Sequence, residues 1–224
     1  MSIDRYNNLM DGESIIVPNG TAISEVPDDF SSLLTENIIA AFSAPDAFFG
    51  NLVKQAQLPE FKQWLEMLAN AGIHSLEIHT SEYVSSDTLL RFELPNGMSP
   101  AISLPSPESE VSLPTPLAEV HSLIGKIKHS DWEMAGGLLG PDSICSIGDM
   151  GTWLSDECDT DPSQCFAFYG SSYGDNGCFT ADGSAFWYAH EIGNLIPSGN
   201  LNDFLKKYFR ALLDGKESHP ENNV

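Results

Sequence analysis

Apolar residues recur at three-to-four spacing between residues 28 and 72, which is the periodicity of amphipathic helices packed on a core. The first run stops at Pro45, a second covers residues 47–57, and a third opens with Leu58-Pro59 and ends at Gly72. The apolar positions of the first and third runs are Phe30, Leu33, Leu34, Ile38 and Phe42, then Phe61, Leu65 and Leu68. This segment is predicted to form three helices.

The period changes to two after Gly72, which is typical of strands. Strands are predicted in residues 73–78, 89–94 and 101–104, with Asn96-Gly97 as a tight turn between the last two. Residues 105–116 then contain four prolines, a composition that favours a domain boundary or a long surface loop.

The second half of the chain reads as one helix, a series of short strands and a closing helix. The predicted elements are a helix in 117–127, strands in 143–147, 151–154, 165–169, 177–180 and 185–189, and a helix in 200–213 that Asn200 or Asn202 caps. The fold class that follows is α+β, an antiparallel sheet flanked by helices, with an N-terminal α+β extension. The predicted regions are a polar arm (1–27), an α+β region (28–105), a second domain (106–216) and a tail (217–224).

The charge pattern changes what the second half is expected to bind. The chain has a net charge of −22, and the 77 residues between Lys128 and Lys206 carry twelve Asp and Glu with no Lys or Arg. Such a surface attracts basic partners. Nucleic acid and anionic membranes are disfavoured as ligands, because both are polyanions.

Several segments of the second half resemble the SUKH superfamily. They are Phe166-Ala-Phe-Tyr169, Gly174-Asp-Asn-Gly177, the run from Ala181 to Glu191, and the helix from Asn200 to Tyr208. The resemblance covers roughly residues 112–214; the run from His129 to Gly137 departs from the family's usual Asn-Gly turn. What the resemblance implies is an α+β fold and the role of a cytoplasmic immunity protein that neutralises a secreted toxin, many of which are nucleases.

A basic nuclease cleft would be occluded by carboxylates that take the place of phosphates. The densest carboxylate cluster lies on a predicted loop, and two tyrosines beside glycines and acids are candidate interface anchors. The predicted partner-binding residues are Asp156, Glu157, Asp159, Asp161, Tyr169, Tyr173 and Asp175. Two other interpretations of the cluster are a solvated loop that aids solubility and a calcium site, although the glycine and glutamate of an EF-hand loop are absent.

An alternative function is a small hydrolase that uses Ser172, because Gly170-Ser-Ser-Tyr-Gly174 follows a predicted strand as a nucleophile elbow does. Asp182 and His190 follow in the order of a catalytic triad. The motif leads into another strand, however, whereas an elbow leads into a helix. The favoured interpretation is therefore a binding protein without catalysis, cofactor or metal; an adaptor that binds a cellular protein is the third.

The expected compartment is the cytoplasm, because the N-terminus has no signal-peptide pattern and no apolar run is long enough to span a bilayer. The four cysteines are Cys145, Cys158, Cys165 and Cys178. They form no Cys-x-x-Cys pair, so they are predicted to be free thiols that bind no zinc.

Overall fold

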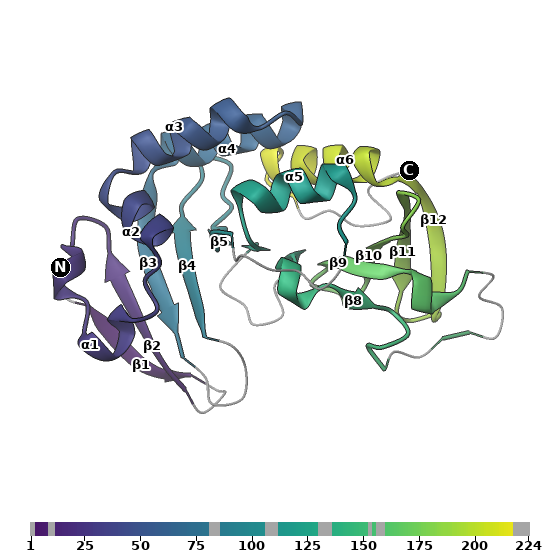
Figure 1. Ribbon diagram of the computed structural model, residues 1–224, viewed down its shortest axis with the longest axis horizontal. Coiled ribbons are helices and arrows are strands. Elements are labelled where there is room, and N and C mark those ends of the chain that lie inside the picture. Colours follow the sequence, from purple (N-terminus) through teal and green to yellow (C-terminus); the bar gives the residue numbers. More distant parts are fainter. Residues whose placement is uncertain are drawn as a thin grey trace.

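The computed structural model has the shape of an arch, with a lobe on each side and helices across the top (Figure 1). It describes residues 3–8, 12–80, 86–105, 112–129, 136–151, 154–155 and 160–216. Each lobe is built on an antiparallel sheet with helices packed on it, so the α+β class predicted from the sequence is confirmed. We call residues 3–129 the N-terminal lobe and residues 136–216 the C-terminal lobe.

The N-terminal lobe contains a six-stranded sheet in the order β1-β2-β3-β4-β5-β6, with every neighbouring pair antiparallel. Its strands are β1 (Asp4–Asn8), β2 (Gly12–Pro18), β3 (Ile73–His79), β4 (Asp87–Phe92), β5 (Ala101–Ile102) and β6 (Ile127–Lys128). Its helices are η1 (Ile23–Glu25), α1 (Asp28–Ser31), α2 (Glu36–Ser43), α3 (Pro45–Gln55), α4 (Pro59–Ala71) and α5 (Thr115–Leu123).

Helix α4 illustrates the local sequence features that made the helices predictable. Pro59 occupies the first turn, where its missing N–H costs nothing, and Gly72 ends the helix with a φ of 72° that favours glycine. The apolar stripe of α4 is buried at Phe61, Trp64, Leu65 and Leu68. Burial of each such side chain contributes about 1.5–3 kcal/mol.

The run predicted as one helix from residue 28 to Pro45 is two helices, α1 and α2. The Thr35 hydroxyl accepts a hydrogen bond from the Ile38 backbone N–H at 3.3 Å, which starts α2 as a separate helix. The capping residue Thr35 therefore separates two helices that the hydrophobic periodicity alone predicted as one.

Residues 4–8 and 12–18 form strands β1 and β2, although residues 1–27 were predicted to be a polar arm. Ile15 and Val17 of β2 are fully buried against the helices. Burial of these two alternate residues fixes β2 in the sheet, and the polar residues around them conceal that signal in the sequence. The predicted turn at Pro18-Asn19-Gly20 is present, because the Thr21 N–H donates to the Pro18 carbonyl.

The C-terminal lobe contains a second antiparallel sheet in the order β12-β11-β10-β9-β7, with β8 also paired to β9. Its elements are β7 (Gly137–Leu138), η2 (Pro141–Ser143), β8 (Cys145–Ser146), η3 (Pro162–Gln164), β9 (Phe166–Gly170), β10 (Asn176–Phe179), β11 (Ser184–Ala189), β12 (Asn194–Asn200) and α6 (Leu201–Leu213). Helix α6 packs on one face of this sheet. A smaller apolar cluster, which includes Ile147 and Cys178, covers part of the other face.

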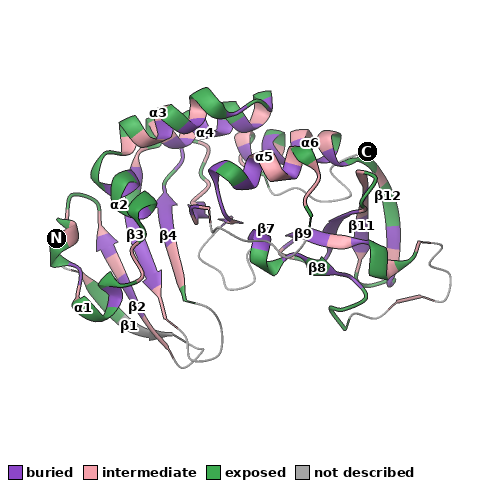
Figure 2. Cartoon of the chain, in the orientation of Figure 1, coloured by how far each residue is buried: buried purple, intermediate pink, exposed green. Residues whose placement is uncertain are grey.

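Helix α6 joins the two lobes. Asn200 caps it, as predicted, by accepting a hydrogen bond from the Asp203 N–H at 2.9 Å. The Phe209 ring lies 4.7 Å from the Phe61 ring and 5.7 Å from the Trp64 ring of α4. Buried residues of both lobes belong to one apolar core, and Figure 2 shows buried segments in the elements of both lobes.

The two sheets also meet directly, at β6 and β7. The His129 N–H donates to the Gly136 carbonyl at 3.0 Å, and a Cβ on Gly137 would lie 1.8 Å from the Ile127 carbonyl oxygen. Strand β6 lies beyond residue 105, where the sequence placed a boundary, and still belongs to the first sheet. Only glycine permits this approach of the two backbones.

We expect Gly137→Ala to lower the free energy of unfolding by about 1–3 kcal/mol, because the added methyl group displaces backbone and not a flexible side chain. The measurement is urea-induced unfolding. Gly50→Ala is the matched control: Gly50 lies inside α3 with open space around it, so this change should stabilise the protein by up to about 1 kcal/mol. Equal urea midpoints for the two variants would refute the close approach of Gly137 to the Ile127 carbonyl.

Candidate partner-binding surface

Four of the seven predicted partner-binding residues lie in the described part of the C-terminal lobe. Asp156, Glu157 and Asp159 lie outside the described residues. Asp161 caps η3, and Tyr173 and Asp175 lie in the turn between β9 and β10, whereas Tyr169 lies inside β9.

The Asp161 carboxylate is exposed and held by its own turn. It caps η3 by accepting hydrogen bonds from the Ser163 N–H at 2.9 Å and from the Ser163 hydroxyl at 2.7 Å. The bonds from Ser163 lower the pKa of Asp161. The side chain is therefore fixed in position and remains negatively charged as the pH falls below the usual range for Asp.

Two more exposed aspartates of this lobe are held in the same way. Asp149 accepts a hydrogen bond from the Ser146 hydroxyl at 2.6 Å. Asp182, in the β10–β11 turn, accepts from the Thr180 hydroxyl at 2.6 Å and from the Ser184 N–H at 3.1 Å, and these bonds lower its pKa. The strand pairing puts all three aspartates at the end of the sheet where β9 begins, which we call the carboxylate end.

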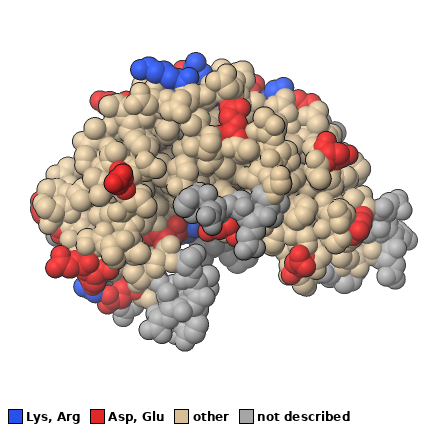
Figure 3. All heavy atoms as spheres, in the orientation of Figure 1, with Lys and Arg blue, Asp and Glu red and all other residues tan. Residues whose placement is uncertain are grey.

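No basic side chain neutralises these three carboxylates among the described residues. Their hydrogen-bond donors are hydroxyl and backbone N–H groups, and the described ion pairs that involve this lobe are Asp175 with His190, Asp203 with Lys206 and Arg210 with Glu60 of the other lobe. Figure 3 shows red groups spread over this lobe, with blue groups confined to its upper, helical edge. The C-terminal lobe thus presents negative charge that its own chain does not compensate.

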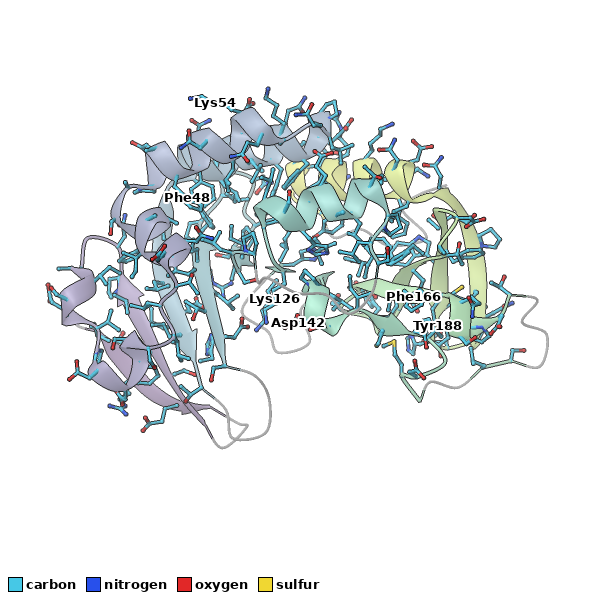
Figure 4. All side chains as sticks on the ribbon, viewed as in Figure 1. Phe48, Lys54, Lys126, Asp142, Phe166 and Tyr188 are labelled. Atoms are coloured by element: carbon cyan, nitrogen blue, oxygen red, sulfur yellow. The ribbon has the colours of Figure 1, made fainter. Side chains whose placement is uncertain are left out.

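The Lys and Arg side chains on or beside the sheet strands lie in the N-terminal lobe, where they pair with carboxylates. Arg91 forms a two-pronged ion pair with the buried Glu77, at 2.8 and 2.9 Å, and Lys126 and Lys128 both approach the Asp87 carboxylate. Figure 4 shows Lys126 at the centre of the arch, near Asp142 of the C-terminal lobe. These cations are therefore already engaged by carboxylates of their own lobe.

The opposite end of the second sheet, which we call the turn end, consists of the β9–β10 turn (171–175) and the β11–β12 turn (190–193). The Asp175 carboxylate joins the two turns by accepting hydrogen bonds from the His190 N–H at 3.0 Å and from the His190 Nδ1 at 2.9 Å. The Ser171 hydroxyl accepts from the Asp175 N–H at 3.0 Å. Tyr173 projects from this braced turn with 67% of its surface exposed.

Tyr169 is not part of any surface, contrary to its prediction as an interface anchor. Its side chain is fully buried and its ring lies 5.5 Å from the Trp187 ring and 5.3 Å from the Tyr208 ring. Both faces of the second sheet are covered, so successive residues of β9 are buried on either side. Tyr169 therefore does not reach solvent.

The residues of the alternative hydrolase do not assemble into a triad. Ser172 lies in a turn that leads into β10, not into a helix. Asp182 and His190 lie at opposite ends of β11, a strand of six residues that spans roughly 20 Å. His190 is instead paired with Asp175, so the elbow-like sequence serves as a β-turn.

Sequence reasoning missed part of the turn end. Ile192, in the β11–β12 turn, is 54% exposed, and Glu191 beside it is exposed as well. The strand β12 that defines this turn was not predicted. The Ser155 N–H donates to the Gly193 carbonyl at 2.8 Å, so the predicted acidic loop, which begins with Asp156, follows directly on a residue fixed at the turn end.

The described cysteines Cys145, Cys165 and Cys178 form no disulfide, and burial raises the pKa of the Cys178 thiol. Cys158 lies outside the described residues. Within the described ranges, no three or more His, Cys, Asp or Glu side chains are grouped so that they could hold a metal ion. The described helices also include none with the length and apolar character that a membrane span requires.

Comparison of the chain with models of protein families, with curated proteins and with solved structures gave no match.

Proposed function

We propose that this chain is a cytoplasmic immunity protein that binds a basic toxin, most simply a nuclease, and neutralises it by one-to-one occlusion. The observation that carries the proposal is the set of exposed carboxylates on the C-terminal lobe, which are held by their own turns and paired with no Lys or Arg there. The resemblance of residues 112–214 to the SUKH superfamily supports the same role.

The arrangement suits inhibition because a nuclease must be basic to bind phosphate. Carboxylates that are already oriented lose little conformational entropy when they meet a basic cleft, and they attract it over a distance. The hydrogen bonds that Asp161 and Asp182 accept lower the pKa of both groups and so favour the charged forms that a basic cleft would meet.

The test is capture of the partner by the purified full chain from a lysate of the source organism, in which toxin-bearing strains are included, followed by mass spectrometry. We expect a basic protein that forms a one-to-one complex and whose nuclease or other toxic activity is abolished at equimolar inhibitor. A partner that remains active in the complex would contradict inhibition and favour the adaptor alternative. Retention of acidic proteins alone would contradict the basic partner.

A further inference from the structure

The turn end of the C-terminal lobe has the features of a binding anchor. Tyr173 and Ile192 are the two most exposed large apolar side chains among the described residues, at 67% and 54% of their surfaces. They project from neighbouring turns, and a single exposed apolar residue is ordinary on a protein surface, whereas two at one braced end are not. Tyrosine is one of the residue types enriched among the hot spots of protein interfaces.

The support of Tyr173 is rigid for identifiable reasons. Asp175 ties its turn to His190 through two hydrogen bonds, and the Ser171 hydroxyl accepts from the N–H groups of Tyr173 and Asp175 at 3.3 and 3.0 Å. The His190 ring also closes over Gly174: a Cβ there would lie 3.3 Å from the ring. Binding therefore requires little further ordering of this turn, which lowers its entropic cost.

The charge around the anchor decides the partner's chemistry. Glu191 is exposed beside Ile192, and no Lys or Arg lies between residues 128 and 206. A guanidinium group both stacks on an aromatic ring and pairs with carboxylates, whereas a lysine ammonium lacks the planar face that stacks. We propose that Tyr173 and Ile192 anchor a protein partner at the turn end through an arginine-bearing surface.

This inference rests on the proposed function and specifies the contact. The turn end and the carboxylate end lie one strand apart, roughly 20 Å. An interface that buries about 800 Å² per partner is wide enough to cover both. The partner's arginines meet Tyr173 at one end, and its other basic residues meet the carboxylates at the other.

The test uses the basic protein captured by the wild-type chain. Tyr173→Ala should weaken its affinity at least about thirtyfold, the loss typical of a hot-spot residue, and Tyr173→Phe should restore most of it because the aromatic face returns. Ile192→Ser should weaken it severalfold. Ile39→Ser is the matched control: Ile39 is an exposed isoleucine on α2 of the N-terminal lobe, and its replacement should leave affinity unchanged.

Photo-cross-linking locates the contact independently of affinity. With p-benzoylphenylalanine in place of Tyr173, we expect a cross-link to the captured protein at a site flanked by arginines, and none with the same group at Ile39. Unchanged affinity of Tyr173→Ala and Ile192→Ser, or a cross-link from position 39 alone, overturns the anchor and leaves the proposed function standing. If the wild-type chain retains no basic protein, both the proposed function and the proposal that Tyr173 and Ile192 anchor a partner are refuted.

Discussion

Glu77→Leu should lower the free energy of unfolding by about 3–5 kcal/mol, because it removes the carboxylate that pairs with the buried Arg91 guanidinium through two hydrogen bonds. Arg91 is only 6% exposed, and its bonds go to both Glu77 oxygens and to the Ser99 carbonyl at 2.7 Å. The measurement is denaturant-induced unfolding at neutral pH. The double variant Glu77→Leu, Arg91→Leu is the control, and it should recover most of the loss since the buried guanidinium is then removed together with its carboxylate.

The same ion pair should make stability fall in acid. Burial alone would raise the pKa of Glu77, but hydrogen bonds from His79 and Arg91 and their positive charges outweigh it and lower the pKa to about 2. Because the folded pKa lies below the unfolded value of about 4.3, this contribution is complete above that value and is lost as the pH falls toward 2. The double variant should show a weaker loss in this range; an identical loss would contradict the role assigned to Glu77.

Removal of the negative charge from the acidic surface should weaken partner binding roughly a hundredfold, because exposed charge pairs contribute about 0.2–1 kcal/mol each. The changes are to the corresponding amides at Asp149, Asp156, Glu157, Asp159, Asp161 and Asp182. Asn and Gln keep an oxygen acceptor, so the turn hydrogen bonds of Asp149, Asp161 and Asp182 are preserved. Affinity is measured by titration of the captured protein, and the thermal midpoint is measured alongside.

The matched control carries the same change in net charge on the other lobe. It replaces exposed N-terminal-lobe carboxylates by amides at Asp4, Glu25, Asp28, Glu36, Asp46 and Glu66. We expect its affinity to stay within a few-fold of wild type. An equal loss in both variants would show that net charge, and not the C-terminal surface, governs binding.

The helices were predictable because their signals are local. Pro59 and Gly72 mark the ends of α4, and Asn200 marks the start of α6, whatever the rest of the chain does. Strands depend on partners far away in the sequence. Strand β12 includes Pro197 and Gly199, both poor strand residues, and only its pairing with β11 makes it a strand.

The site was predictable in its charge but not in its geometry. The sequence shows the acidic run. It does not show that the Asp161 and Asp182 carboxylates accept hydrogen bonds from neighbouring hydroxyl groups, or that the turn of Ile192 lies beside the turn of Tyr173. Tyr169 was misplaced because alternation identifies an exposed residue only when one face of a sheet is open. Helix α6 and the smaller apolar cluster cover both faces of this one.

The most direct test of the account is the association rate constant for the captured basic protein, measured at low and at physiological salt. For wild type and for the N-terminal-lobe control we predict a steep fall as salt rises, because screening becomes strong beyond about 8 Å at 0.15 M. The variant with the six C-terminal-lobe amides should associate slowly at both concentrations. A wild-type rate that does not change with salt, or a C-terminal variant as fast as wild type, would contradict binding through the acidic surface.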